Sequence, residues 1–167
     1  PMGAQAREKG LGFEALIPDS LPTAVRLDPT RTRQVLFNLL SNAIKFTERG
    51  SVGFEVDVQP GPNADTIELV FTVRDTGIGM SAASVERLFE RFFQVESRLN
   101  RRRGGSGLGL NISRALAELM GGSLQVESRE GHGSSFTLRL PTTLEASAAP
   151  CFADTSPPPP PPSAATL

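Results

Sequence analysis

The chain has 167 residues, with 17 basic and 18 acidic side chains, one cysteine and a formal net charge of −1. This balance argues against non-specific binding to nucleic acids or anionic membranes, and we expect this domain to contact neither. One cysteine excludes an internal disulfide framework and a cysteine-based zinc site. No apolar run approaches the roughly 20 residues of a membrane span. We therefore expect a cytoplasmic domain, with any membrane anchor lying elsewhere in the full-length protein.

Composition divides the chain into three parts. We interpret residues 1–4 as a cloning remnant and residues 5–143 as one folded domain. Residues 144–167 are rich in Pro and Ala and include six consecutive prolines, so we expect a disordered linker.

Two periodicities of apolar residues divide the folded part into elements, because alternation is typical of strands and a spacing of three and four of helices. Asp28 before Pro29 predicts a helix start, and Ser81 predicts another. The expected elements are, in order, strands 11–17 and 24–27, helix 29–46, strands 52–58 and 67–74, helix 82–89, helix 108–120, and strands 123–128 and 135–140.

These elements predict an α/β (α+β) two-layer sandwich, in which helices cover one face of a mixed, mostly antiparallel sheet. Residues 94–106 are charged and rich in Gly, without periodicity, and predict a mobile loop. The helix 108–120 should present one apolar side, made of Leu108, Ile112, Ala115, Leu116 and Leu119.

Asn38 and Asn42 lie one turn apart on the polar face of the helix 29–46. A solvated helix face is one interpretation. However, Asn is a poor helix former, and amide oxygens suit Mg²⁺ that keeps most of its waters and takes further ligands from phosphates. Lys45, about one turn further along this face, would supply a cation for those phosphates. Spacing alone leaves both interpretations open.

Two segments rich in glycine also have two interpretations each. Asp75 ends a strand and precedes Gly77 and Gly79, which is an ordinary turn signature. Alternatively, the carboxylate accepts a hydrogen bond from an amine such as that of adenine, while the glycines let a ligand approach closely.

Residues 104–110 precede a helix, whose free N–H groups favour phosphate, or they form a flexible hinge. They match neither a Walker loop nor a Rossmann fingerprint.

Taken together, these segments resemble the histidine kinase branch of the Bergerat-fold ATPases, the superfamily that also contains gyrase, Hsp90 and the MutL proteins. The resemblance covers roughly residues 5–141. The asparagine box is found at 28–47, the first glycine box at 75–80, the phenylalanine box at 88–94, the second glycine box at 105–110, and a third glycine element at 131–137.

The resemblance implies ATP and Mg²⁺ as cofactors and a role for each matching residue. Asn38 and Lys45 would be catalytic and near the phosphates, Asn42 would hold the Mg²⁺, and Asp75 would accept from the adenine amine. A mobile lid at about 80–105 would close over the triphosphate. The other residues that would contact the nucleotide are Phe46, Gly77, Ile78, Gly79, Met80, Gly105, Gly107, Leu108, Gly109, Leu110 and, through water, Thr137.

Two positions depart from the family pattern. Gln94 stands where many members have an Arg that reaches the γ-phosphate, and Arg98 or one of the arginines at 101–103 is a candidate substitute. Asn38 stands where the hydrolysing relatives have a Glu general base. This difference favours phosphotransfer to histidine, because a neutral imidazole already offers a lone pair. His132, between two glycines, is interpreted as a surface turn residue.

The implied function is that of the ATP-binding catalytic domain of a two-component sensor histidine kinase. It would transfer the γ-phosphoryl group of Mg·ATP to a histidine on a dimerisation domain, which we expect N-terminal to residue 1. The next partner would be a response regulator, or a receiver domain fused in a hybrid kinase. One alternative is a gyrase-like or Hsp90-like ATP hydrolase, which Asn38 disfavours. The other is a non-enzymatic nucleotide-sensing module, which intact Asn42, Lys45 and Asp75 disfavour.

Overall fold

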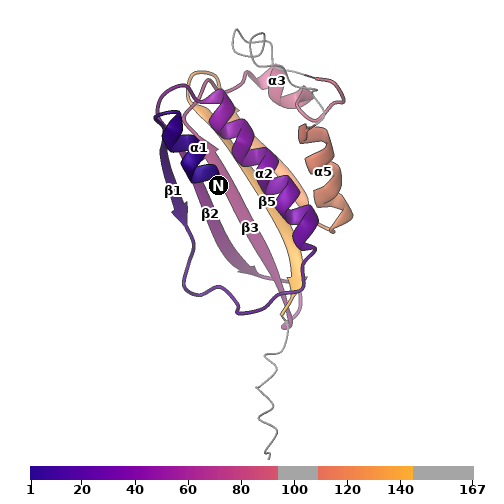
Figure 1. The fold of residues 1–167 in the computed structure, drawn as a ribbon. Helices are drawn as coiled ribbons and strands as arrows, with labels where there is room; N and C mark the ends of the chain where they lie inside the picture. The colour runs from indigo at the N-terminus through magenta and orange to yellow at the C-terminus, as the bar shows by residue number, and fades with distance from the viewer. Residues whose placement is uncertain (94–108, 145–167) are drawn as a thin grey trace, which may run out of the picture.

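The computed structural model describes residues 1–93 and 109–144 (Figure 1). Its strands form one sheet in the order β1-β2-β3-β5-β4. The elements are α1 (Met2–Glu8), β1 (Gly12–Leu16), α2 (Pro29–Phe46), β2 (Ser51–Pro60), β3 (Thr66–Asp75), α3 (Ala82–Arg87), α5 (Gly109–Leu119), β4 (Ser123–Arg129) and β5 (Gly133–Thr143).

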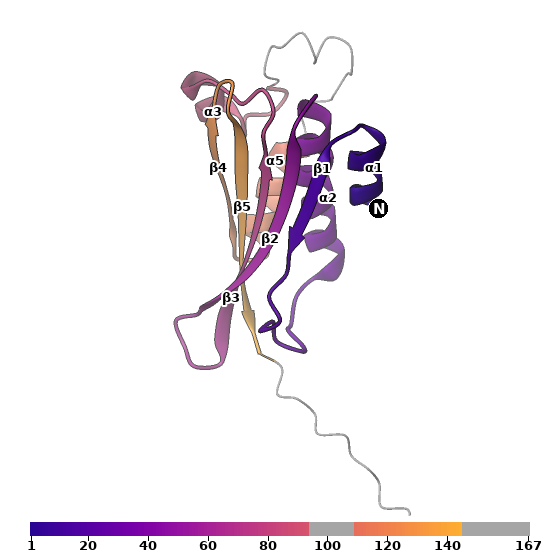
Figure 2. The same ribbon diagram turned by 90° about the vertical axis from the view of Figure 1, so that its left-hand side faces the viewer.

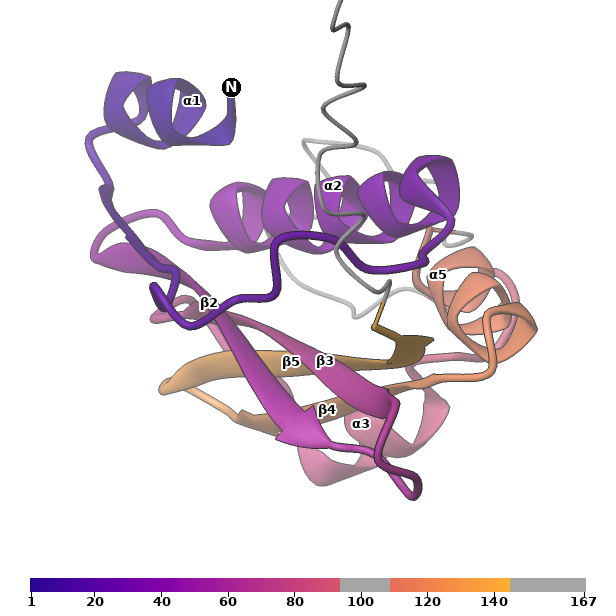
Figure 3. The same cartoon turned by 90° about the horizontal axis from the view of Figure 1, so that it is seen from below.

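The sheet is mixed, as predicted. β1 pairs with β2 in parallel, whereas the β2–β3, β3–β5 and β4–β5 pairs are antiparallel. Figure 2 shows α1 and α2 on one side of the sheet, and Figure 3 shows α5 on that same side. The shorter α3 contacts β4 near one end of the sheet. No helix among the described residues is long and apolar enough to span a membrane.

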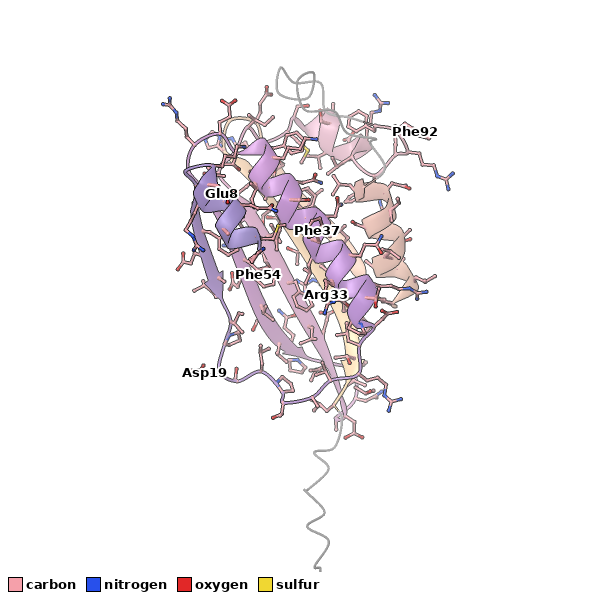
Figure 4. The ribbon with its side chains drawn as sticks, viewed as in Figure 1. Glu8, Asp19, Arg33, Phe37, Phe54 and Phe92 are labelled. Carbon is pink, nitrogen blue, oxygen red and sulfur yellow. The ribbon has the colours of Figure 1, made fainter. Side chains whose placement is uncertain are left out.

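The core lies between the sheet and α2. The side chains of Val52 and Val73 on neighbouring strands are fully buried and pack with Val35 of α2, and the Phe54 and Phe71 rings stack with centroids 6.4 Å apart. Alternate residues of each strand thus face the helices, which is the physical basis of the period-2 pattern. On α2, by contrast, Phe37 is 57% exposed and lies on the outer side of the helix (Figure 4).

The predicted helix starts are confirmed. The Asp28 carboxylate accepts a hydrogen bond from the Arg31 N–H at 3.0 Å, so it caps α2 as the Asp-Pro pattern predicts. The Ser81 hydroxyl accepts from the Ser84 N–H at 3.3 Å and caps α3. These caps position the two helices that flank the end of β3.

One expectation about the elements was wrong. Residues 24–27 form no strand. Val25 makes only an isolated antiparallel bridge to Leu144, because the chain lies beside the end of β5 at this one residue. α1 begins at Met2, which packs against the core, so this helix spans the expected boundary after residue 4. The expected linker lies outside the described residues except for Leu144.

The apolar side predicted for the last helix is buried only in part, through Leu116, which packs against the core. Ile112 is 42% and Leu119 65% exposed, whereas the buried residues of α5 are the small Ser113 and Ala117. α5 packs against both α2 and the sheet, and small residues let the two helices approach closely. Volume at the contact, rather than hydrophobicity alone, therefore decides which face of α5 is buried.

Candidate functional site

The polar face of α2 changes in exposure along the helix. Arg31 and Gln34, near its start, are exposed, whereas Asn38, Asn42 and Lys45 are half-buried. These five residues form a polar stripe along α2, and only the first half of this stripe is a solvated helix face. Its second half runs into the structure toward the end of β3.

Asn38 lies at the contact between α2 and α5. Its side-chain nitrogen donates to the Ser113 hydroxyl at 2.9 Å. A Cβ on Gly109 would lie only 2.6 Å from the Asn38 side-chain oxygen, so a larger residue at 109 would displace either this amide or the first turn of α5. Sequence reasoning missed Ser113, although the spacing of Gly109, Ser113 and Ala117 marks a face of small residues on α5.

The loop of residues 75–80, after β3, lies against the C-terminal end of α2. The Gly77 N–H donates to the Asp75 carboxylate at 2.9 Å, and the Ile78 N–H donates to the Phe46 carbonyl oxygen at 3.4 Å. A Cβ on Gly77 would overlap that same carbonyl oxygen. The structure thus brings Asp75 and the last turn of α2 to one end of the domain, although about 30 residues separate them.

The β4–β5 hairpin holds the other side of this loop. The Met80 N–H donates to the Ser128 hydroxyl at 2.8 Å, and the Gly131 N–H donates to the Ile78 carbonyl oxygen at 2.7 Å. Gly79 has a φ of +64°, and a Cβ there would overlap the Arg129 carbonyl oxygen. Sequence reasoning missed Ser128, whose contact with the loop depends on the pairing of the hairpin.

Asp75 presents a half-buried carboxylate on the helix side of the sheet. It lies two residues after the buried Val73, so both side chains face α2. Burial raises the pKa of the Asp75 carboxyl above its usual range, while hydrogen bonds from the backbone of Gly77 and of Ser134 oppose this rise. A carboxylate has about four acceptor positions. Asp75 can therefore accept a further hydrogen bond from a donor on a ligand.

Thr137 lies on the face of the sheet opposite to Asp75, so the strand pairing does not place it beside a nucleotide bound there. It alternates with Phe136 and Leu138, which are buried on the helix side. A sheet places successive side chains on opposite faces. Ser134 is paired with Asp75 between β3 and β5, so its side chain lies on the same face of the sheet as the Asp75 carboxylate. The Ser134 hydroxyl makes a hydrogen bond with the Ser128 hydroxyl at 2.8 Å.

The remaining predicted residues fall into two groups. The Lys45 ammonium lies 5.3 Å from the ring centroid of Phe46, and Met80 is buried in the core cluster beside the half-buried Ile78. Leu110 lies in the first turn of α5 and packs partly against the core. Residues outside the described part of the chain include the predicted contacts Gly105, Gly107 and Leu108, together with Gln94, Arg98, Arg101, Arg102 and Arg103 and most of the predicted lid.

The donor chemistry fits a cation that arrives with phosphates. Within residues 1–93 and 109–144, no group of three His, Cys, Asp or Glu side chains could hold a metal by itself. The stripe on α2 offers neutral amide oxygens and one ammonium group instead. Such a set suits Mg²⁺, which keeps several waters and binds through substrate phosphates, but it would not retain a free metal ion strongly.

Residues 27–144 match the family of histidine kinase-, DNA gyrase B-, and HSP90-like ATPases. The chain belongs to this family. It is 45% identical over 133 residues to the sensor histidine kinase RcsC of Escherichia coli strain K12, which covers 80% of this chain and 13% of RcsC. It is 42% identical over 142 residues to the sensor protein GacS of Pseudomonas syringae pv. syringae, which covers 84% of this chain and 16% of GacS. The chain therefore spans a small part of these relatives.

Solved structures agree with this assignment. Full-length ShkA in complex with AMPPNP superimposes with a TM-score of 0.70 and 34% identity, over 87% of this chain and 28% of ShkA. The mycobacterial sensor histidine kinase MprB has the same fold, with a TM-score of 0.60 and 24% identity over 86% of this chain and 93% of that chain. The predicted fold class and the resemblance to a histidine kinase ATP-binding domain are confirmed.

Proposed function

We propose that this domain binds Mg·ATP at the end of the sheet where Asp75 meets the last turn of α2, and that it phosphorylates a histidine of a dimerisation domain. Asp75 would accept from the adenine amine, because it is a half-buried carboxylate held by the Gly77 N–H. Gly77, Gly79, Ile78 and Met80 would border the base. This arrangement requires a cytoplasmic location, where ATP is available.

The phosphates would lie along the half-buried stripe of α2. We infer that Asn42 contributes an oxygen to the Mg²⁺ and that Lys45 contacts the phosphates. When bound, Mg²⁺ would neutralise phosphate charge that develops in the reaction. Lys45 and the N–H groups at the start of α5 would add positive potential on the same side.

The reaction class follows from Asn38, and this observation carries the proposal. Asn38 is neutral and its amide is engaged with the Ser113 hydroxyl, so this position supplies no general base to activate water. A histidine imidazole needs no such base. Its neutral nitrogen would attack the γ-phosphorus, the bond from that phosphorus to the bridging oxygen would break, and ADP would leave with the electron pair.

The partners belong to the same proposal. Both relatives described above are much longer than this chain, which leaves room in such proteins for a dimerisation domain and a receiver. We propose that the phosphoryl group passes from that histidine to a response regulator or a fused receiver domain. No nucleic acid is required at any step.

The test is to incubate the domain with γ-labelled ATP, alone and with its dimerisation domain added in trans. Alone, it should bind ATP but neither label itself nor release phosphate quickly, because positioned general-base catalysis is typically worth about 10²–10⁴-fold. Added dimerisation domain should acquire acid-labile label. Rapid phosphate release without an acceptor would instead support a gyrase-like hydrolase. Failure to bind nucleotide would contradict both.

A further inference from the structure

The C-terminal end of α2 has four carbonyl groups that the helix itself cannot satisfy, and the structure accounts for all of them. The Thr47 hydroxyl donates to the Ala43 oxygen at 2.7 Å. The loop after β3 supplies a donor to the Phe46 oxygen, as described above. The ammonium group of Lys9 donates to the two carbonyl oxygens between them, those of Ile44 at 2.6 Å and Lys45 at 3.2 Å.

Lys9 reaches these carbonyls because the end of α1 is fixed in the core. Ala6 is fully buried and Leu11 is 3% exposed, and the Leu11 N–H donates to the Ala6 oxygen at 2.9 Å across a turn that contains Gly10 with a φ of +80°. Figure 1 shows α1 beside the end of α2, and residues of the two helices contact each other. The side chain of Lys9 thus reaches from the end of α1 to the end of α2.

A lysine suits this position for two reasons. An ammonium group is a compact charge with three rotatable donors, so it can serve two successive carbonyls, whereas the planar guanidinium fork of Arg matches carboxylates and phosphates better. A cation at a helix C-terminus is also favoured by the helix dipole. The sequence has only two lysines against 15 arginines, and both lysines meet at this turn.

We propose that Lys9 is a positioning residue for the nucleotide site: it holds the last turn of α2, with Asn42, Lys45 and Phe46, in place against the loop that carries Asp75. This inference rests on the proposed function of that site. If Lys9 has this role, the position of α1 contributes to the affinity of the site for the triphosphate. By thermodynamic linkage, a bound nucleotide must then stabilise the attachment of α1 by the same factor.

The test compares Lys9→Met, which keeps the length of the side chain but removes the ammonium group, with Lys9→Arg and with the control Arg7→Met. Arg7 is an exposed cation on α1, one turn or less from Lys9. Calorimetry should give AMPPNP·Mg affinity about three- to tenfold weaker for Lys9→Met and unchanged for Arg7→Met. Lys9→Arg should recover part of the loss, because it restores a cation.

Hydrogen exchange supplies a readout that a purely structural role would not change. In the wild type, AMPPNP·Mg should increase the protection of α1 amides, and in Lys9→Met this increase should disappear while α5 still responds. A less stable Lys9→Met that keeps wild-type affinity and wild-type nucleotide-dependent protection would overturn the inference.

If Lys9→Met does not fold, Lys9→Gln replaces it in the same measurements, because Gln lacks the charge and its side chain is one bond shorter, so its amide should not serve both carbonyl oxygens. Weaker affinity of a folded Lys9→Gln supports the inference, and wild-type affinity overturns it. A wild-type domain that binds no AMPPNP would contradict the proposed function instead, so the two failures are distinguishable.

Discussion

Asn38 and Ser113 are joined by a hydrogen bond of 2.9 Å that links α2 to α5. Ser113 is 2% exposed, so its hydroxyl has little access to water. The bond therefore fixes the orientation of the Asn38 amide, which in the proposed function favours phosphotransfer over hydrolysis, and it ties that amide to α5.

Replacing Ser113 by Ala should destabilise the domain by about 0.5–1.5 kcal/mol, the usual net contribution of a hydrogen bond. Urea denaturation measures this change. Ser20→Ala is the control, because Ser20 is exposed in a turn and its loss should be nearly neutral. Equal stability of the two variants would show that the Asn38–Ser113 bond contributes nothing to the packing of α5.

Asp75→Asn should weaken ATP binding and reduce the preference for adenine over guanine, because an acceptor becomes a group that can also donate. The loss of a hydrogen bond to a charged group typically costs about 1.5–3 kcal/mol. Calorimetry with ATP and GTP measures both effects. Asp57→Asn, on an exposed part of β2, should change neither affinity. Unchanged ATP affinity of Asp75→Asn would remove the adenine assignment.

The raised pKa of Asp75 predicts a pH dependence of stability in the nucleotide-free domain. The folded state binds the proton more readily than the unfolded state, so this group favours folding most at pH values below the ordinary pKa of 3.8. That contribution should be lost as the pH rises through the folded pKa. The unfolding free energy of wild type minus that of Asp75→Asn should therefore fall over this range and then level off. A difference that rises with pH would contradict the burial of the carboxylate.

Asn42→Ala should mainly abolish the gain in AMPPNP affinity that Mg²⁺ produces in the wild type, because an amide oxygen is lost from the stripe on α2. Titrations with and without Mg²⁺ measure the gain. Asn63→Ala, in the loop between β2 and β3, is the matched control. If Asn42→Ala keeps the full gain, another residue holds the metal.

Gly79→Ala should destabilise the domain by more than about 1 kcal/mol and weaken nucleotide binding. Its φ of +64° is unfavourable for a side chain, and the new Cβ would overlap the Arg129 carbonyl oxygen. Gly53→Ala is the control, because a Cβ there meets nothing within 4 Å. Thermal unfolding of the two variants should separate by several degrees; coincident curves would mean that the loop readily moves away from the β4–β5 hairpin.

Local rules predicted much of the fold. The cap at Asp28 and the spacing of apolar residues gave α2 its observed bounds, and alternation gave the strands of the sheet. The same alternation would have placed Thr137 on the outer face, had it been applied to the site as well as to the core. The expected Thr137 contact rested on the family resemblance alone, whereas the face of β5 on which a residue lies is set by its place in the alternation.

Other features depend on contacts that no local pattern contains. Lys9 and Ser113 were not predicted, because their partners on α2 are 35 and 75 residues away in the sequence. The buried face of α5 was predicted only in part, for a related reason. Its small residues are buried because another helix lies against them, and that neighbour is a property of the tertiary structure.

The meeting of Lys9 and Lys45 at one turn has a consequence for chemical labelling. The sequence contains no other ε-amino group, since every remaining cationic side chain is Arg or His132. Acylating reagents that attack amines therefore have two lysine targets in this chain, and both lie at the end of α2. The rates of acylation at these two residues, read separately by mass spectrometry, would report occupancy of the proposed nucleotide site without any probe having to be introduced.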